Sequence, residues 1–246
     1  MIVIQSKANA LVKQTKKLNQ KKYRKDSYLI EGWHLLEEAI AAKATLRRVF
    51  TLECYKERCH DIKELVLVSE EVLRELSDSP TPQGVIAEVE MPSNEWDLTT
   101  LDRLLVLEDV QDPGNLGTMV RTADAAGFDA VILSDKSADI YNPKTLRSMQ
   151  GSHFHLTIYR RAMSELLQEL KQREVSILAT TLSEVSVDYR EVSPKVPFAL
   201  VMGNEGKGIS QSVIEASDKL LHIPMYGQAE SLNVAVAAGI LMFRLL

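Results

Sequence analysis

Ile223-Pro-Met-Tyr-Gly-Gln-Ala-Glu-Ser-Leu-Asn-Val-Ala-Val-Ala-Ala-Gly239 is the stretch that says most about the fold of this chain. It predicts a short apolar strand, a turn of small residues and the start of a helix. Glu230, Ser231 and Asn233 fall where that helix begins, although one such side chain is enough to cap the free backbone N–H groups. Because residues 234–246 are almost wholly apolar, we expect a buried helix with surplus polar groups at its start. This pattern indicates either a ligand site or an over-supplied helix cap.

Two earlier stretches share the pattern of an apolar strand that runs into a glycine-containing turn. The first is Leu104-Leu-Val-Leu-Glu-Asp-Val-Gln-Asp-Pro-Gly-Asn-Leu-Gly-Thr-Met-Val-Arg121, which predicts a strand and then a helix from about Asn115 to Ala126. The second is Phe198-Ala-Leu-Val-Met-Gly-Asn-Glu-Gly-Lys-Gly-Ile209.

Taken together, these stretches resemble the SpoU/TrmH family of RNA ribose 2′-O-methyltransferases, within the SPOUT class. The matching motifs are Asp112-Pro-Gly-Asn-Leu-Gly117 with Arg121, then Gly203-Asn-Glu-Gly-Lys-Gly208, then Ile223-Pro-Met225 with Glu230-Ser-Leu-Asn233. The resemblance covers roughly residues 100–246. It implies S-adenosylmethionine (AdoMet) as cofactor, a homodimer, and a C-terminal trefoil knot whose backbone forms the cofactor pocket.

The rest of the chain predicts two domains. Residues 1–92 read as a small α/β unit that looks like the RNA substrate-binding domain preceding many SpoU-type catalytic domains, with a polar, proline-marked linker after it. Residues 98–246 alternate apolar strands with helices, which predicts an α/β fold with a mainly parallel sheet covered on both faces. The predicted strands of this second domain are 104–108, 130–134, 155–159, 176–180, 198–202 and 220–223.

Composition limits the class of protein. A chain of 246 residues with 45% hydrophobic content suits one large or two modest globular domains. No apolar run reaches the ~20 residues that span a bilayer, and no signal-peptide layout is present, so we expect no membrane association. Cys54 and Cys59 are too few for a metal cage and predict reduced thiols in a cytoplasmic protein.

Charge is distributed unevenly although the formal net charge is only -5. The first 25 residues carry eight lysines and arginines and no acidic residue, so all 34 acidic residues lie after them. A solvated helix face would explain such a segment, but beside an RNA enzyme it predicts contacts with phosphates. The residues assigned to this contact are Lys13, Lys16, Lys17, Lys21, Lys22 and Arg24.

Transfer of a methyl group to a ribose 2′-oxygen requires an in-line donor, loss of the hydroxyl proton and stabilisation of charge on oxygen. The family's catalytic arginine matches Arg121, which either stabilises the oxyanion or acts as a deprotonated base; a surface salt bridge to Asp124 is the alternative. By the same resemblance, Asn115 orients Arg121 or a phosphate and caps its helix, and Glu205 orders the active-site loops. Ser231 and Asn233 would bind the ribose or place the arginine.

The resemblance also implies a set of cofactor contacts around the three loops. Backbone near Met202 and Gly203 would hold AdoMet, and Ile223, Met225 and Leu232 would surround its adenine. The full set is Thr180, Thr181, Met202, Gly203, Asn204, Gly206, Ile223, Pro224, Met225, Ser231 and Leu232.

A further segment, Tyr141-Asn-Pro-Lys-Thr-Leu-Arg-Ser-Met-Gln-Gly-Ser-His153, is similar to the family's Asn-Pro-Lys…Arg stretch. It predicts phosphate contacts by Lys144 and Arg147, or else a capped surface helix. His153 and His155 are two residues apart without a third ligand, so we expect no metal site.

The predicted activity is therefore methylation of a ribose 2′-hydroxyl of RNA, with 23S rRNA as the favoured substrate. A tRNA 2′-O-methyltransferase and a catalytically inactive RNA-binding assembly factor are the alternatives. A nucleotide-binding α/β protein of another class is disfavoured, because the glycine loops fit neither the dinucleotide-binding nor the P-loop pattern.

Overall fold

The computed structural model describes residues 2–93, 95–183 and 185–246, and these form two compact units. The first unit comprises residues up to Ser93 together with Asp139–Phe154, and the second comprises the remainder. None of the helices in the described residues is long and apolar enough to cross a membrane.

The first unit is built on a five-stranded sheet with the strand order β1-β4-β3-β5-β2. Strands β1, β4 and β3 are parallel to one another, whereas β5 is antiparallel to both β3 and β2. The strands are β1 (Ile2–Ile4), β2 (Ser27–Glu31), β3 (Leu46–Thr51), β4 (Leu65–Val68) and β5 (Val85–Glu90).

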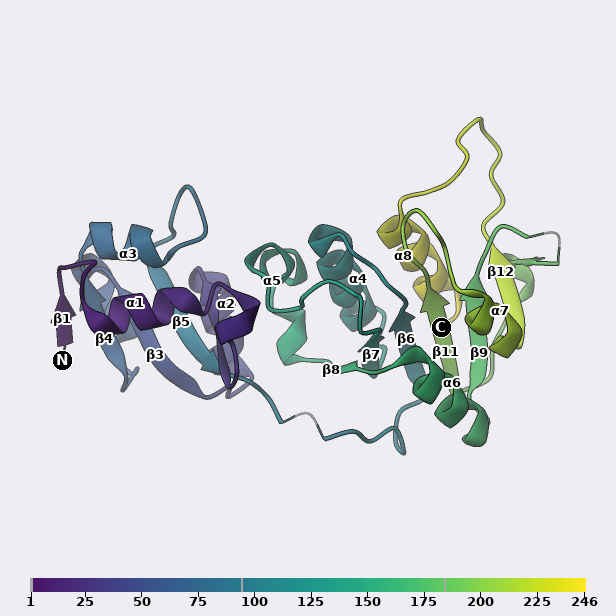
Figure 1. Ribbon diagram of the computed structural model, residues 1–246, viewed down its shortest axis with the longest axis horizontal. Coiled ribbons are helices and arrows are strands. Elements are labelled where there is room, and N and C mark those ends of the chain that lie inside the picture. Colours follow the sequence, from purple (N-terminus) through teal and green to yellow (C-terminus); the bar gives the residue numbers. More distant parts are fainter. Residues whose placement is uncertain (1, 94, 184) are drawn as a thin grey trace. The chain divides into compact units, whose positions relative to one another are not determined.

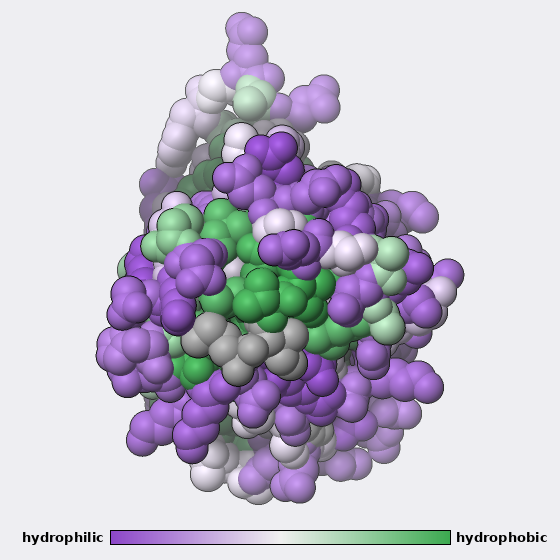
Figure 2. Space-filling model, turned by 90° about the vertical axis from the view of Figure 1, so that its left-hand side faces the viewer, coloured by the Kyte–Doolittle hydropathy of each residue, from purple (hydrophilic) through white to green (hydrophobic). Residues whose placement is uncertain are grey.

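Three helices and two 3-10 turns accompany this sheet. Helix α1 contacts α3, and a core containing Val12, Phe50, Leu73 and Ile86 lies beneath them. Figure 2 shows an apolar area, ringed by hydrophilic residues, on the side of this unit that is on the left in Figure 1. The elements are α1 (Ala10–Lys17), η1 (Lys21–Tyr23), α2 (Trp33–Ala41), η2 (Glu53–Cys59) and α3 (Glu70–Leu76).

The segment Asp139–Phe154 packs within the first unit, although in the sequence it lies between β7 and β8 of the second unit. It contains α5 (Pro143–Met149) and η3 (Ser152–Phe154). The ring of Tyr28 lies 4.4 Å from that of Tyr141, and the Tyr28 hydroxyl is 3.1 Å from His153 Nε2. The sequence prediction had placed all of 98–246 in one domain, so this segment is where the structure differs from it.

The second unit contains a seven-stranded sheet, entirely parallel, with the order β10-β12-β9-β11-β6-β7-β8. The central strands contain only apolar residues besides Arg103 because both of their faces are covered. The strands are β6 (Arg103–Leu107), β7 (Ala130–Leu133), β8 (Thr157–Arg160), β9 (Ser176–Thr180), β10 (Val187–Asp188), β11 (Phe198–Met202) and β12 (Lys219–His222).

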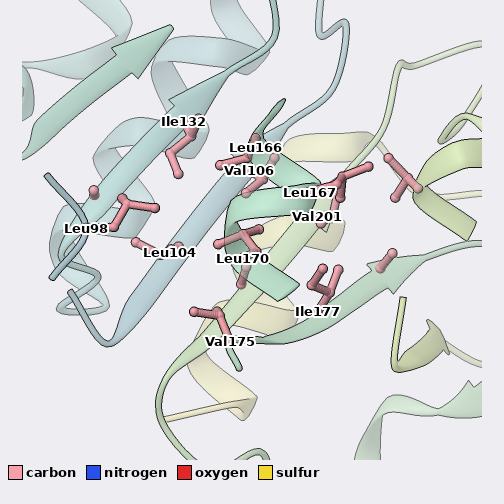
Figure 3. Close-up of a cluster of buried hydrophobic side chains, with 14 of the residues drawn as sticks. Leu98, Leu104, Val106, Ile132, Leu166, Leu167, Leu170, Val175, Ile177 and Val201 are labelled. Atoms are coloured by element: carbon pink, nitrogen blue, oxygen red, sulfur yellow. The ribbon is translucent and has the colours of Figure 1, made fainter. Parts of the chain in front are cut away.

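Helices cover both faces of this sheet (Figure 1). Figure 3 shows one side of the core, where Leu166, Leu167 and Leu170 of α6 lie over strand residues such as Val106 and Ile177. Helix α8 contacts α4 and β11, and α6 contacts α7 and β9. The helices are α4 (Pro113–Ala125), α6 (Met163–Gln172), α7 (Gln211–Ala216) and α8 (Val234–Arg244), with the 3-10 turn η4 at Tyr189–Glu191.

The fold class predicted from the sequence, α/β with a mainly parallel sheet, is confirmed. The trefoil knot implied by the resemblance stays a prediction. Because all seven strands run in the same direction, the loops that follow β6, β9, β11 and β12 all leave the sheet at the C-terminal ends of the strands. This end of the sheet carries the candidate site.

Candidate functional site

A cavity of about 650 Å³ lies where the loops after β9, β11 and β12 meet the N-terminus of α8. Its volume is within the range of small-molecule sites, ~300–1,000 Å³. The wall combines aliphatic side chains with hydroxyl, amide and carboxylate groups. It is lined by Thr180, Thr181, Leu182, Met202, Gly203, Asn204, Glu205, Gly206, Lys207, Gly208, Leu221, His222, Ile223, Met225, Glu230, Ser231, Leu232, Asn233, Val234, Ala237 and Leu241.

The glycine loop, residues 203–208, is folded tightly on itself. Its ends are joined by two backbone hydrogen bonds of 2.9 Å between Asn204 and Gly208. A Cβ atom at Gly203 would lie 2.3–2.5 Å from backbone atoms of Gly208 and Ile209, so a side chain is excluded there. Gly208 has φ +68, which also favours glycine. The loop therefore requires these two glycines for its own closure.

Asn115 connects the glycine loop with the start of α8. Its Nδ2 donates to Glu205 Oε1 at 3.2 Å, and its Oδ1 accepts a hydrogen bond of 3.0 Å from Asn233 Nδ2. Asn233 is also the N-cap of α8, since its Oδ1 accepts from Ala235 and Val236 N–H. The three residues thus form one hydrogen-bond network that joins the first turn of α4, the glycine loop and the N-terminus of α8.

Glu205 acts as an acceptor for the loop after β6. Besides the Asn115 amide, its carboxylate accepts from the backbone N–H of Gln111 at 3.3 Å and of Asp112 at 3.1 Å. Burial alone would raise the pKa of Glu205, but the hydrogen bonds to its ionised form outweigh burial and lower that pKa below its ordinary value. The carboxylate is therefore ionised at neutral pH, with hydrogen-bond donors around it.

Arg121 lies on α4, six residues after Asn115, and its side chain is exposed. It does not line the cavity, and no hydrogen bond or ion pair ties it to another of the described residues. The alternative salt bridge to Asp124 is not formed, because Asp124 Oδ2 instead lies 2.9 Å from His155 Nδ1. The guanidinium is thus available to a substrate.

The cap of α4 differs from the sequence prediction. The helix begins at Pro113 with Asp112 as N-cap, whose Oδ1 accepts from Asn115 N–H at 2.8 Å. Asn115 was expected to cap this helix, but it lies inside the first turn. Its side chain is hydrogen-bonded to Glu205 and Asn233, and among the described residues no hydrogen bond joins it to Arg121.

The structure brings most of the predicted cofactor residues to the cavity wall; Pro224 is the exception. Ser231 and Asn233 also line the cavity, whereas Asn115 and Arg121 do not. Sequence reasoning missed Val234, Ala237 and Leu241, although their spacing of three and seven residues along α8 marks one helix face. It also missed Leu182, Lys207, Leu221 and His222, which adjoin residues that it did name.

The basic N-terminal residues are largely exposed. Lys17 and Lys22 lie 5.6 and 4.9 Å from the ring centre of Tyr23, an exposed aromatic residue. Lys16 is paired with Glu75, whereas no ion pair is formed by Lys13 within the described part of the chain. The segment therefore presents cations around an aromatic ring.

Two arginines assigned to RNA are used differently. The side chain of Arg24 is only 4% exposed and is paired with Asp139, so the structure gives it a role inside the first unit, in place of the predicted phosphate contact. Arg147 lies 3.5 Å from Asp78 and remains about half exposed. Lys144, at the start of α5, is exposed.

His153 lies in η3, and His155 lies before β8, which begins at Thr157 and not at residue 155 as predicted. In the part of the chain that the structure describes, no group of three or more His, Cys, Asp or Glu residues is placed to hold a metal ion.

Comparison with known proteins agrees with this geometry. Residues 102–243 match the model of the SpoU rRNA Methylase family, and residues 9–87 match an MRM3-like substrate binding domain. The Bacillus subtilis 23S rRNA (guanosine(2553)-2′-O)-methyltransferase RlmP is 42% identical, covering 98% of both chains.

Solved structures give the same result. The AdoMet-bound rRNA methyltransferase from Sinorhizobium meliloti superimposes with a TM-score of 0.88 at 31% identity, covering 98% of this chain and 96% of that one. The A. aeolicus TrmH/SpoU tRNA modifying enzyme is 38% identical with a TM-score of 0.53, but covers only 59% of this chain and 74% of its own. The chain belongs to the SpoU rRNA methylase family.

Proposed function

We propose that this protein transfers a methyl group from AdoMet to a ribose 2′-hydroxyl of 23S rRNA. The observation that carries the proposal is a cavity built by three strand-end loops and linked to the arginine-bearing helix α4 through the hydrogen bond between Asn115 and Asn233. The relative RlmP matches over 98% of this chain, and so includes the first unit, whereas the tRNA enzyme covers only 59% of this chain. This difference supports rRNA over tRNA.

The cavity fits AdoMet in size and chemistry. Leu221, Ile223 and Leu241 offer an apolar wall for an adenine ring, while Thr180 and Ser231 offer hydroxyl groups. Close backbone approach within the glycine loop leaves N–H and C=O groups near the cavity without intervening side chains. When bound, AdoMet supplies an electrophilic methyl group on a sulfonium.

The chain's own residues then divide the work. Arg121 places a positive charge where the 2′-oxygen loses its proton, because a guanidinium remains protonated at neutral pH. Glu205 is a poor general base, since its carboxylate has a lowered pKa and already accepts several hydrogen bonds. Its role is to hold the loop after β6 against the glycine loop. Ser231 lies at the cavity wall, where it can donate to the ribose.

RNA capture is assigned to the first unit. Lys13, Lys17, Lys21 and Lys22 provide positive charge, and Tyr23 between them offers a surface on which a base can stack. Phosphate neutralisation by such residues gives affinity that depends strongly on salt. Lys144 and Arg147 extend the proposed RNA contact.

We also propose a homodimer formed through α8. One side of this helix contacts α4 and β11, yet Val236, Phe243 and Leu246 on or beside it are 52–56% exposed. Exposed apolar groups of this size on a single helix are typical of an interface. A cytoplasmic location remains a prediction from the unpaired thiols of Cys54 and Cys59.

The deciding experiment is a comparison of ribose methylation in RNA from a deletion strain and its parent. We expect one 2′-O-methyl group to disappear from 23S rRNA, with the site equivalent to guanosine 2553 of the RlmP substrate examined first. Adding purified protein and AdoMet to the unmodified RNA should restore it. Loss of a methyl group from tRNA instead would contradict the rRNA assignment, and unchanged maps would contradict the activity.

A further inference from the structure

Two consecutive residues after β6 form hydrogen bonds on either side of the glycine loop, one to Asn204 near its start and one to Ser210, two residues beyond its end. At the exit, Glu108 Oε2 accepts a hydrogen bond of 2.7 Å from Ser210 N–H, and Glu108 is 7% exposed. At the entry, the carbonyl oxygen of Asp109 accepts a bond of 2.8 Å from Asn204 Nδ2. Neither Glu108 nor Asp109 lines the cavity.

The contact at the entry determines the conformation of the loop itself. Asn204 Oδ1 accepts from the backbone N–H groups of Gly206 and Lys207, each at 3.0 Å. The Asn204 side chain is therefore held by Asp109 at one end and organises two cavity-lining residues at the other. A change in the direction of the Asp109 carbonyl would release this side chain.

Asp109 presents its carbonyl in this direction because its backbone is left-handed, with φ +55. Aspartate tolerates this region better than most residues, since its short side chain can form local hydrogen bonds. Here Ser134 Oγ accepts from Asp109 N–H at 2.8 Å and donates to Asp109 Oδ1 at 2.7 Å. Ser134 is buried, so the left-handed conformation is fixed from both sides of the residue.

We propose that Glu108 and Asp109 are positioning residues that clamp the glycine loop in its AdoMet-binding conformation, an inference that rests on the proposed function. The carbonyl of Asp109 and the carboxylate of Glu108 act on the cofactor only through residues 203–210. Asp109 contributes by its backbone conformation, and its negative charge is not required.

Substitutions at Asp109 separate the backbone from the side chain. Valine is β-branched and strongly disfavours the left-handed region, and alanine disfavours it less, whereas glycine and asparagine accept it. By calorimetry with AdoMet, we expect Asp109→Val to bind about tenfold more weakly, on the order of one lost hydrogen bond to a positioned group. Asp109→Ala should be intermediate, and Asp109→Gly and Asp109→Asn should bind like the parent.

Glu174→Val is the matched control. Glu174 is also a non-glycine residue with positive φ, +57, and it lies in the exposed turn between α6 and β9, outside the cavity wall. Its substitution imposes similar backbone strain, so we expect parent-like AdoMet affinity. At the other end of the loop, Glu108→Gln keeps an oxygen acceptor for Ser210 N–H and should bind better than Glu108→Leu.

Hydrogen exchange without any ligand provides a readout that is independent of the proposed function. In Asp109→Val and in the milder Asp109→Ala, amides of the peptide that contains Gly206 and Lys207 should exchange faster than in the parent and in Glu174→Val. A double variant with Asn204→Ala should exchange no faster than Asn204→Ala alone, because both changes remove the same contact.

The outcomes distinguish the clamp formed by Glu108 and Asp109 from the proposal that AdoMet is the cofactor. The clamp would be overturned by unaltered hydrogen exchange in the glycine loop of Asp109→Val and Asp109→Ala, or by additive effects on exchange in the double variant with Asn204→Ala. An equal loss of AdoMet affinity in Glu174→Val would also overturn it. A parent protein that binds no AdoMet, yet shows the expected exchange pattern, would retain the clamp and refute the proposed cofactor.

Discussion

Replacement of Arg121 by alanine should separate catalysis from folding and from cofactor binding. Arg121 is exposed on α4, has no hydrogen bond or ion pair among the described residues, and does not line the cavity. Loss of an exposed side chain of this kind usually changes the free energy of unfolding by no more than about 0.5 kcal/mol. AdoMet affinity should also stay at the parent value, because none of the cavity contacts is removed.

The effect on the chemical step should be large. Removal of one group that stabilises an oxyanion typically costs ~2.7–4 kcal/mol, or roughly a hundred- to a thousandfold in rate. Single-turnover methylation at saturating RNA measures this step, and calorimetry measures AdoMet affinity in parallel. Arg173→Ala is the matched control, since it also removes an arginine from the second unit but only breaks an ion pair with Glu169.

Arg121→Lys distinguishes the two roles considered for the guanidinium. A lysine that stabilises charge keeps part of the rate without a pH dependence between neutral pH and about 9, because its pKa is near 10.4. A lysine that acts as base gains rate with pH up to that pKa. Near-parent turnover by Arg121→Ala would refute the assignment of Arg121 altogether, as would a loss of AdoMet affinity equal to the loss of rate.

Three further predictions concern RNA capture, assembly and pH. Neutralising Lys13, Lys16, Lys17, Lys21 and Lys22 together should lower RNA affinity and reduce the dependence of that affinity on salt by up to about one unit of log–log slope per lost phosphate contact, while turnover at saturating RNA persists. Unchanged RNA affinity in filter binding, or an equal loss on neutralising Lys43, Lys56 and Lys63 as a control, would contradict this prediction. In sedimentation, Phe243→Glu should convert a homodimer into monomers, whereas Ile40→Glu, which changes an exposed apolar residue outside α8, should not. A parent protein that is monomeric at micromolar concentration would contradict the proposed interface. Hydrogen bonds lower the pKa of Glu205 in the folded state, so its contribution to stability is present above the unfolded pKa of ~4.3 and is lost as pH falls through the lower folded value. The difference in melting temperature between the parent and Glu205→Gln should therefore shrink below about pH 4. A difference that stays constant with pH would argue against an ionised Glu205.

The interior strands could be predicted from sequence because burial on both faces leaves apolar runs. Strands β6, β7, β9 and β11 all lie within one or two residues of their expected positions. Short edge strands carry no such signal: β1 and β10, of three and two residues, were not predicted. The predicted start of β8 was two residues early because the apolar and aromatic pattern begins in the preceding 3-10 turn.

Pairings between distant residues could not be predicted from composition or spacing. Arg24 belongs to a run of basic residues, and only the fold shows that Asp139, 115 positions away, buries it in an ion pair. Likewise, Asn115 was expected to orient Arg121 or a phosphate, but its side chain is hydrogen-bonded to Glu205 and Asn233, 90 and 118 positions away. In both cases the local pattern identified a polar side chain, but only the three-dimensional structure shows which residue that side chain contacts.

The hydrogen bonds of the site separate the residues that organise it from those left for chemistry. Asn233 uses its oxygen to cap α8 and its amide to bind Asn115, and Asn115 uses its own amide on Glu205. These side chains have few remaining donors for a substrate, so their substitution should act mainly through loop geometry. Arg121 and Ser231, by contrast, form no hydrogen bond or ion pair within the described residues and keep their donors available. We therefore expect recognition of the ribose to fall to these two residues, because the hydrogen bonds of the other three side chains are already used within the site.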